Sequence, residues 1–299
     1  MINVYEGVDQ NKRRSLIIMV LFVVFIGFFV WVLSELLGYG PGMVGIGLIL
    51  AGLMSFSSYW WGDKIILALS GARPADREKD FNFYTVAENL ALAAQIPKPK
   101  LFVIEDGAPN AFATGRDPQH AVICATTGLL EKLDRTELEG VIAHELSHIR
   151  NYDIRLMSLV TILVGMVTLM ADWLLRGARF GRSEKGKSGQ LGGLFLIVGL
   201  ILAILSPLIA QMMKLALSRR REFLADASAV MITRFPDGLA RALEKISQDQ
   251  EPLEAANKAT AHLYIVNPFK GQKLTAKFAS LFNTHPPVEE RIKLLKAMR

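Results

Sequence analysis

Two histidines and a glutamate carry the clearest chemistry in the sequence, in the pattern His144-Glu145-x-x-His148. On a helix, positions i and i+4 lie on one face, so both imidazoles can face the same metal ion. Zinc binds histidine nitrogens at about 2.0–2.1 Å and lowers the pKa of a bound water to about 7. Glu145 stands beside the first histidine and is free to accept a proton from that water. The spacing therefore predicts a metal-dependent hydrolytic site.

A catalytic zinc site usually has three protein ligands, so a third residue is needed. No third histidine follows the motif at close spacing, which leaves a carboxylate from a later helix as the alternative. Glu222 and Asp226 are four residues apart, so the first can bind zinc while the second hydrogen-bonds a ligand imidazole from behind. The competing interpretation is a salt bridge from Glu222 to the arginines at 219–221.

The elements that must position these residues are mostly helices. The helix that carries the histidines is expected to begin at Asp134, which can cap its first turn. Apolar residues at helical spacing predict an earlier helix over 80–96. Short strands are expected at 100–105 and 120–126, and the chain after residue 213 is expected to be mainly helical. A small sheet packed against helices is the predicted surrounding of the site.

Long apolar segments alternate with these polar regions, at 16–33, 36–62, 156–175 and 188–213. The first two are uncharged and about as long as a membrane-spanning helix, which needs about 20 residues. The aromatic cluster at 59–61 suits a membrane–water interface. The third segment is short and the fourth contains Pro207, so buried core helices remain an alternative for these two. We expect the first segment to be retained as an anchor.

Basic residues predict the orientation in the membrane. They flank the first apolar hairpin at both of its ends, at Lys12, Arg13, Arg14, Lys64, Arg73, Arg77 and Lys79. The positive-inside rule then places both ends in the cytoplasm. The connection of the second hairpin, 176–187, is also basic, which does not follow the rule. An even number of crossings nevertheless returns His148 and Glu222 to the same side of the membrane.

Composition limits the class of protein. The chain has 299 residues, 51% of them hydrophobic, which excludes a disordered protein. One cysteine, Cys124, excludes a disulfide scaffold and is expected to be a buried small residue. The net charge of +6 fits the membrane bias, and we expect no nucleic-acid partner. His120 and His262 are expected to be structural. Four regions are expected along the chain. Residues 1–62 form an N-terminal tail with a transmembrane hairpin, and 63–155 form the first catalytic part. A second hydrophobic hairpin follows at 156–213, and the second catalytic part at 214–299.

Four motifs together resemble the HtpX family of membrane zinc endopeptidases. They are HELSH at 144–148, RREFLAD at 220–226, NAFATG at 110–115 and THPP at 284–287. The resemblance implies one Zn²⁺ per chain, bound by His144, His148 and Glu222, with Glu145 as general base and Asp226 behind a ligand. It implies a mainly α fold with a small β-sheet, about four hydrophobic helices and a zincin-like (gluzincin) catalytic domain.

The same resemblance implies a multi-pass protease of the plasma (inner) membrane that faces the cytoplasm. Its substrates would be misfolded or damaged membrane proteins or unfolded polypeptides, cleaved under stress. The related CAAX prenyl proteases share the catalytic pattern but are longer and have more membrane helices, so prenyl-protein cleavage is the alternative. A membrane chaperone with a structural zinc is a second alternative, although structural sites usually fill the fourth position with Cys or His. No feature of the sequence fixes the oligomeric state.

Two further sites are expected on the substrate side of the metal. The small residues Asn110, Ala111, Phe112 and Ala113 can offer an edge to which a peptide adds as an extra strand, and an ordinary turn is the alternative. His285 or Arg291 can stabilise the oxyanion of the attacked carbonyl. A capping histidine and a solvated arginine are the alternatives for that pair.

Overall fold

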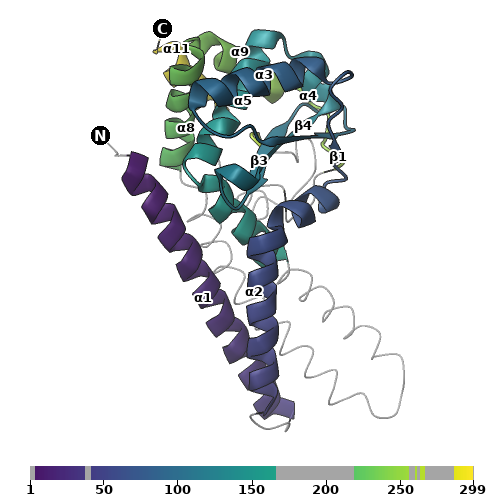
Figure 1. Cartoon of the computed structure of the whole chain (residues 1–299), viewed down its shortest axis with the longest axis vertical. Helices are drawn as coiled ribbons and strands as arrows, with labels where there is room; N and C mark the ends of the chain where they lie inside the picture. The colour runs from purple at the N-terminus through teal and green to yellow at the C-terminus, as the bar shows by residue number, and fades with distance from the viewer. Residues whose placement is uncertain are drawn as a thin grey trace.

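The structure, a computed structural model, describes residues 4–37, 42–165, 219–255, 260, 263–266 and 286–298. Its helices and strands follow one another as α1 (Val4–Leu37), α2 (Gly42–Leu69), β1 (Arg73–Pro74), α3 (Phe81–Ala94), β2 (Lys100–Ile104), β3 (Ala111–Gly115), a 3₁₀ turn (Pro118–His120), β4 (Ala121–Thr126), α4 (Thr127–Lys132), α5 (Arg135–Arg150), α8 (Arg219–Thr233), α9 (Pro236–Gln248) and α11 (Val288–Lys296). The described part is mainly helical with one small sheet, as predicted (Figure 1).

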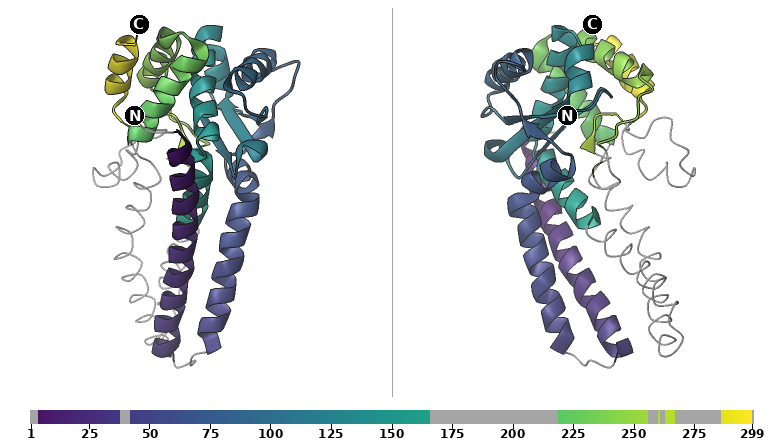
Figure 2. Two further views of the ribbon diagram at one scale, coloured as in Figure 1. Left: turned by 60° about the vertical axis from the view of Figure 1, so that its left-hand side comes forward. Right: turned by 90° about the vertical axis from the view of Figure 1, so that its right-hand side faces the viewer.

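Helices α1 and α2 form a long antiparallel hairpin that extends away from the rest of the molecule (Figures 1 and 2). Both are long and apolar enough to cross a membrane, over Asp9–Val32 and Gly42–Leu69. Glycine allows their backbones to approach closely, because a Cβ at Gly47 would lie 2.6 Å from the side chain of Val30. Many large apolar side chains on the hairpin are exposed, as a lipid-facing surface requires. The first two predicted apolar segments are therefore helices of membrane-spanning length.

The later apolar segments are described only in part. Residues 153–165 are helical and include the first ten residues of the third predicted segment, and side chains such as Leu156, Val160 and Leu163 are buried. The rest of this segment, the basic connection and the fourth segment at 188–213 lie outside the described residues. The prediction of about four hydrophobic helices is thus met for two of them.

The sheet has the order β1-β2-β4-β3 and mixes parallel with antiparallel pairs. The β2–β4 pair is parallel, whereas β1–β2 and β3–β4 are antiparallel. Strands β2 and β4 match the predicted strands to within one residue at an end. β1 and β3 were not predicted as strands, because β1 has two residues and β3 consists largely of small residues with little preference for extended structure.

The predicted catalytic region is the described part of 63–155 and 214–299, and helix α5 lies at its centre, between the sheet and the other helices. It packs against α3, α8, α9 and β3, and nearly all its residues from Glu137 to Ile149 are buried (Figure 1). Its approach to α9 is very close, because a Cβ at Gly140 would lie 2.5 Å from the backbone nitrogen of Leu239. The kink of α2 at Trp61 lets its last two turns leave the hairpin, so that Ile66 joins the core beneath the sheet. The central helix is the element that carries the histidine motif.

Candidate metal and active site

Helix α5 brings the two histidines of the motif together. Asp134 accepts a hydrogen bond from the backbone N–H of Glu137, and the Glu137 side chain accepts one from the backbone N–H of Asp134, which confirms the predicted capping box. One face of the helix then presents His144 and His148, with their Nε2 atoms 3.2 Å apart and both rings buried. The fixed start of the helix and the four-residue spacing thus aim two imidazole nitrogens at one point.

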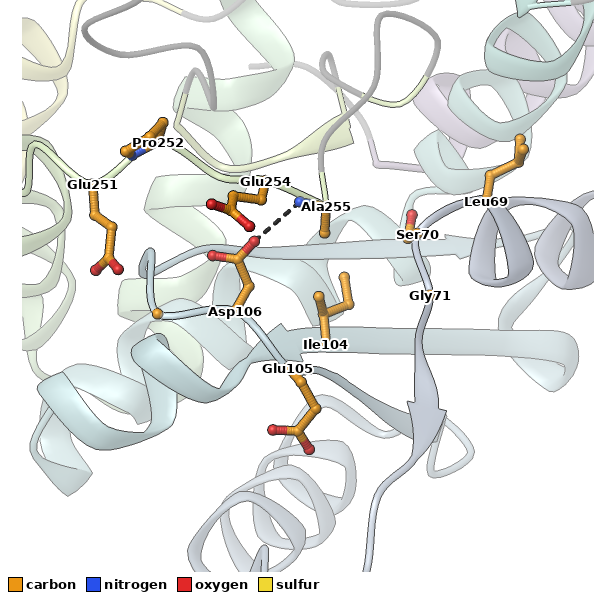
Figure 3. A pocket seen from close by; sticks show the side chains of 11 residues that line it. Leu69, Ser70, Gly71, Ile104, Glu105, Asp106, Glu251, Pro252, Glu254 and Ala255 are labelled. Atoms are coloured by element: carbon orange, nitrogen blue, oxygen red, sulfur yellow. Dashed lines mark hydrogen bonds between the residues drawn. The ribbon is translucent and has the colours of Figure 1, made fainter.

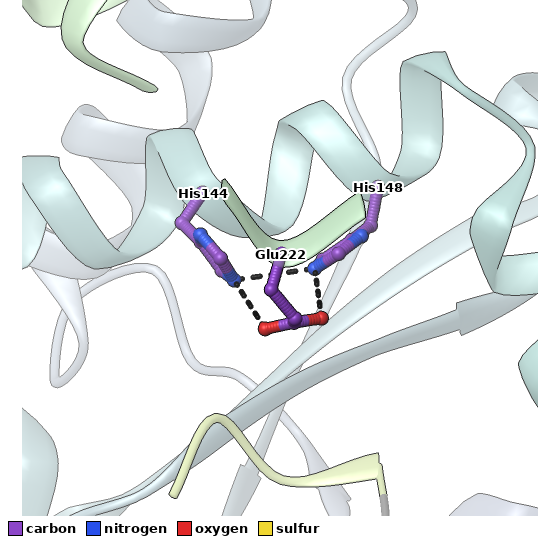
Figure 4. A group of neighbouring side chains, drawn as sticks. All are labelled: His144, His148 and Glu222. Carbon is purple, nitrogen blue, oxygen red and sulfur yellow. Dashed lines mark hydrogen bonds and ion pairs between the residues drawn. The ribbon is translucent and has the colours of Figure 1, made fainter. Parts of the chain in front are cut away.

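Glu222 of α8 completes a group of three ligand atoms (Figure 4). Its carboxylate oxygens lie 3.4 Å from His148 Nε2 and 3.7 Å from His144 Nε2, and all the candidate ligand atoms lie within 4.8 Å of one another. Two ligands bound to zinc at about 2.05 Å with a tetrahedral angle are about 3.3 Å apart. The observed spacing fits that geometry, and the two-histidine, one-carboxylate donor set is one that zinc favours.

A second carboxylate on α8 supports the first histidine from behind. Asp226 Oδ1 lies 2.9 Å from His144 Nδ1, so the ring nitrogen that does not face the cluster has a hydrogen-bond partner. Arg291 of α11 donates to both oxygens of Asp226, from Nε at 2.9 Å and from Nη2 at 2.7 Å. Burial opposes ionisation of Asp226, but the guanidinium of Arg291 outweighs it and lowers the pKa of Asp226 to about 2.

The second histidine is supported by a residue that the sequence did not predict. Asp153 Oδ2 lies 3.1 Å from His148 Nδ1. Burial lowers the pKa of His148, but the hydrogen bond to Asp153 and the nearby charge of Glu222 raise it to about 9 overall. Each imidazole therefore has one nitrogen toward the cluster and the other held by a carboxylate, as metal-binding histidines usually do. Asp153 lies only five residues after His148, and this closeness in the sequence is the one feature from which its role could have been predicted.

Glu145, the predicted general base, is buried beside the two histidines on α5. The charge of Glu145 contributes to raising the pKa of both His148 and Arg291, so its carboxylate lies near the cluster. Its predicted catalytic role stays a prediction.

Arg291, one of the two residues predicted to stabilise the oxyanion, is buried beside the ligand cluster. Its side chain is 0% exposed, and its nitrogens contact Asp226 and the backbone oxygen of Ile265. Nη2 also lies 3.4 and 3.5 Å from the two ring nitrogens of His144, and Nη1 lies 3.8 Å from Glu222 Oε2. The alternative of a solvated arginine is wrong, because the guanidinium is fully buried. These contacts favour a role in holding Asp226 over contact with a substrate carbonyl. His285, the other candidate for the oxyanion, lies outside the described residues.

The segment Asn110–Ala113 leads into and forms most of β3, so the alternative of an ordinary turn is wrong. β3 stands at the end of the described sheet, next to α5. The backbone oxygen of Ala111 accepts from Ile265, and the backbone nitrogen of Gly115 donates to Ser158, both on the side away from β4. Because backbone groups alternate along a strand, those of Ala113 point to the same side.

The other candidate reactive residues that the structure describes include His120 and Cys124. His120 is exposed and contacts Asp117 at 2.6 Å, whereas His262 lies outside the described residues. Cys124 is buried in β4, and burial raises the pKa of its thiol. A cavity of about 850 Å³ beyond the end of β2 is lined by several carboxylates, and Asp106 accepts there from the backbone nitrogen of Ala255 at 3.0 Å (Figure 3). The lining of this cavity includes none of the three candidate ligands.

Comparison with known proteins agrees with this geometry. The sequence matches Peptidase family M48 over residues 78–299. The chain belongs to this family. Among its relatives, a protease HtpX homolog of Dictyoglomus thermophilum is 43% identical over 98% of this chain and 94% of its own length. HtpX homologs of Thermoanaerobacter pseudethanolicus and Streptococcus uberis are 45% and 41% identical over 98% of this chain and cover 97% and 99% of those proteins.

The M48 match and the full-length HtpX relatives identify the chain as a membrane-associated metalloprotease. The resemblance predicted from the sequence motifs is thus confirmed. A crystal structure of Ste24p from S. mikatae aligns with a TM-score of 0.48 and 19% identity, over 97% of this chain and 67% of that one. This likeness is too distant to indicate the fold or the substrate of the chain.

Proposed function

We propose that the protein is a zinc-dependent endopeptidase of the plasma (inner) membrane that hydrolyses peptide bonds of misfolded or damaged membrane proteins on the cytoplasmic side. The observation that carries the proposal is the cluster of His144, His148 and Glu222, whose ligand atoms lie within 4.8 Å of one another. The cluster lies near the start of α1, because Asp153 contacts both His148 and Asn11, and basic residues precede the apolar segment there. That charge pattern supports the cytoplasmic orientation.

The donor set supports zinc as the metal. The two Nε2 atoms and the Glu222 carboxylate have the spacing of tetrahedral ligands, and three protein ligands leave room for water, as in catalytic zinc sites. When bound, zinc supplies a Lewis acid that polarises the scissile carbonyl and makes a water molecule acidic. The carboxylates behind the two imidazoles, Asp226 and Asp153, hold their rings in the ligating orientation.

The acid–base work of the reaction falls to Glu145. Its carboxylate accepts the proton of the attacking water and later gives it to the leaving amine, so one residue serves both steps. Its place directly after His144 on a rigid, buried helix fixes it beside the ligand cluster. Arg291 acts indirectly, by holding Asp226 against His144. His285 keeps its predicted role at the oxyanion.

The edge of β3 is the proposed binding site for the substrate peptide. A peptide in extended form can hydrogen-bond to the backbone of Ala113, between the points where Ala111 and Gly115 already have partners. Recognition through the backbone depends little on side chains, which suits substrates that share only an unfolded conformation. The strand packs against α5, so a peptide bound there passes along the helix that carries the ligands.

The experiment that tests the proposal separates chemistry from metal binding. We expect Glu145→Gln to retain zinc but to lose cleavage of casein or an unfolded membrane protein by at least 10²-fold, as the loss of a general base does. His144→Ala should lose both zinc and activity, because it removes a ligand. His120→Ala, at an exposed histidine outside the cluster, is the matched control and should change neither. Near-normal turnover by Glu145→Gln, or normal zinc content in His144→Ala, would contradict the assigned roles.

A further inference from the structure

Asn11 is a buried polar residue on the membrane helix α1, five positions before its apolar segment. It is 3% exposed, and its amide makes three contacts with residues at least 140 positions away. Its Nδ2 donates to Asp153 Oδ1 at 2.7 Å and to the backbone oxygen of Asn151 at 3.0 Å. Its Oδ1 accepts from Arg221 at 3.3 Å. The amide therefore joins the start of α1, the end of α5 and the start of α8.

Asp153 connects this amide to the metal site. One of its oxygens, Oδ1, accepts from Asn11 and from Arg221 at 3.2 Å, while the other lies 3.1 Å from His148 Nδ1. Two donors on one oxygen fix the rotation of the carboxylate, and the carboxylate in turn fixes the ring of His148. A carboxylate in this position usually changes metal affinity by about 10- to 100-fold when it is lost.

The chain has to break its helix to bring Asp153 to this place. In a continuous helix, residue i+5 lies about 140° around the axis from residue i, so it could not lie behind His148. Helix α5 ends at Arg150, and Tyr152 adopts a φ of 60°, in the left-handed region that is uncommon for residues other than glycine. The backbone oxygen of Asn151, at the end of the helix, is one that needs an outside partner, and Asn11 supplies it.

A second contact holds α1 against the same turn. The ammonium group of Lys12 lies 4.7 Å from the centre of the Tyr152 ring. Both Asn11 and Lys12 therefore bind the turn that carries Asp153. The membrane helix is one of the elements that hold this turn, together with Arg221 of α8.

We propose that Asn11 is a positioning residue of the metal site, which holds Asp153 against His148 and so makes zinc retention depend on the docking of α1. The inference rests on the proposed function, since it requires that His144, His148 and Glu222 bind zinc. The contacts of Asn11 are with Asp153, Arg221 and the backbone of Asn151, so it reaches the ligand His148 through Asp153, which Arg221 also contacts. The membrane anchor is then part of the catalytic unit.

The test measures zinc affinity in the full-length protein, by competition with a chromophoric chelator. Asn11→Leu keeps the volume but removes the donor, and we expect zinc to bind 10- to 100-fold more weakly. Ser15→Ala is the matched control, because Ser15 is also buried on α1, one turn further along, and donates to the backbone of Asn11. It should retain zinc to within about twofold of the wild type.

The outcomes separate this inference from a merely structural role and from the proposed function. If Asn11 only anchors α1, the melting temperature of the metal-free variant falls while its zinc affinity stays that of the wild type, and this result overturns the inference. Should Asn11→Leu fail to fold, Asn11→Ala, measured on its folded fraction, replaces it with the same expectation. A wild-type protein that binds no zinc contradicts the proposed function itself, and the inference with it.

Discussion

At the scale of single residues, the site consists of charges that are buried in pairs. Arg291 and Asp226 are 0% and 2% exposed and form two parallel hydrogen bonds. Burying two charges costs several kcal/mol, and the attraction between them offsets this only while both are present. The intact pair therefore adds little to the free energy of unfolding, but removal of one member should lower that free energy strongly. Its value to the protein is the fixed orientation of His144.

Breaking this buried pair should therefore cost a large part of the stability of the protein. We expect Arg291→Met to lower the free energy of unfolding of the metal-free protein by about 3–5 kcal/mol, because Asp226 loses its guanidinium partner and stays buried with only the His144 contact of the two described above. Lys296→Met is the matched control on the same helix, since Lys296 pairs with Glu244 at the surface at 2.6 Å. It should cost about 0–1 kcal/mol. Denaturant unfolding measures both, and equal losses would contradict the buried-pair argument.

The site residues that could be predicted from the sequence are those whose positions follow from short spacings along one helix. The two histidines, Glu145 and their common face follow from a four-residue spacing on one helix. Asp226 was predicted for the same reason, from its spacing to Glu222. Asp153 and Asn11 were missed, because the first needs a break in the helix and the second needs the tertiary docking of α1. Neither event leaves a periodic pattern in the sequence.

At the scale of elements, the position of α5 depends on how closely α9 approaches it. A Cβ at Gly140 would lie 2.5 Å from the backbone nitrogen and 2.7 Å from the Cα of Leu239, so no side-chain movement can make room. His144 follows one turn later on the same helix. A displacement of α5 from α9 would therefore also move a metal ligand.

We expect Gly140→Ala to destabilise the protein by about 1–3 kcal/mol, as overpacking does. The ordinary effect of Gly→Ala in a helix is the opposite, a gain of about 1 kcal/mol. Gly45→Ala is the control, because Gly45 lies on α2 with nothing within 4 Å of its would-be Cβ. Thermal unfolding of the two variants should shift in different directions or by clearly different amounts. A neutral Gly140→Ala would show that α5 and α9 are not in close contact.

The elements were predictable where end signals and apolar periodicity agreed. Asp134 and Glu137 fixed the start of α5, and the apolar residues of 100–105 and 120–126 gave β2 and β4. β3 was not predicted as a strand, because its sequence, AFATG, has no alternation of apolar and polar residues and ends in glycine. Its extended form is imposed by pairing with β4 and by its burial against α5, which are both long-range effects.

At the scale of the whole molecule, the match to Peptidase family M48 begins at residue 78, yet the structure joins the earlier hairpin to the site. α1 extends beyond its apolar segment and reaches the end of α5, while α2 passes its kink and enters the core beneath the sheet. The hairpin therefore packs against the region that carries the site as well as being its predicted membrane anchor. Its two contacts with the catalytic region fix the position of the site relative to the hairpin.

This geometry makes the orientation testable with single cysteines. Cys124 is buried, so the unmodified protein should react little with a thiol reagent. Glu35 is exposed near the far end of α1, and Arg77 is exposed in the catalytic region with 74% of its side chain accessible. Because one candidate membrane span, α2, lies between these two positions, they should face opposite sides of the membrane.

We therefore expect Glu35→Cys to react with a membrane-impermeant reagent in right-side-out vesicles, and Arg77→Cys to react only after the membrane is opened. Inside-out vesicles should give the reverse pattern, which controls for the intrinsic reactivity of each cysteine. If Arg77→Cys is labelled first in right-side-out vesicles, the catalytic region faces outward and the cytoplasmic assignment is wrong. If both react equally in intact vesicles of each kind, the hairpin does not cross, and the exposed apolar surface of α1 and α2 must be covered by protein instead of lipid.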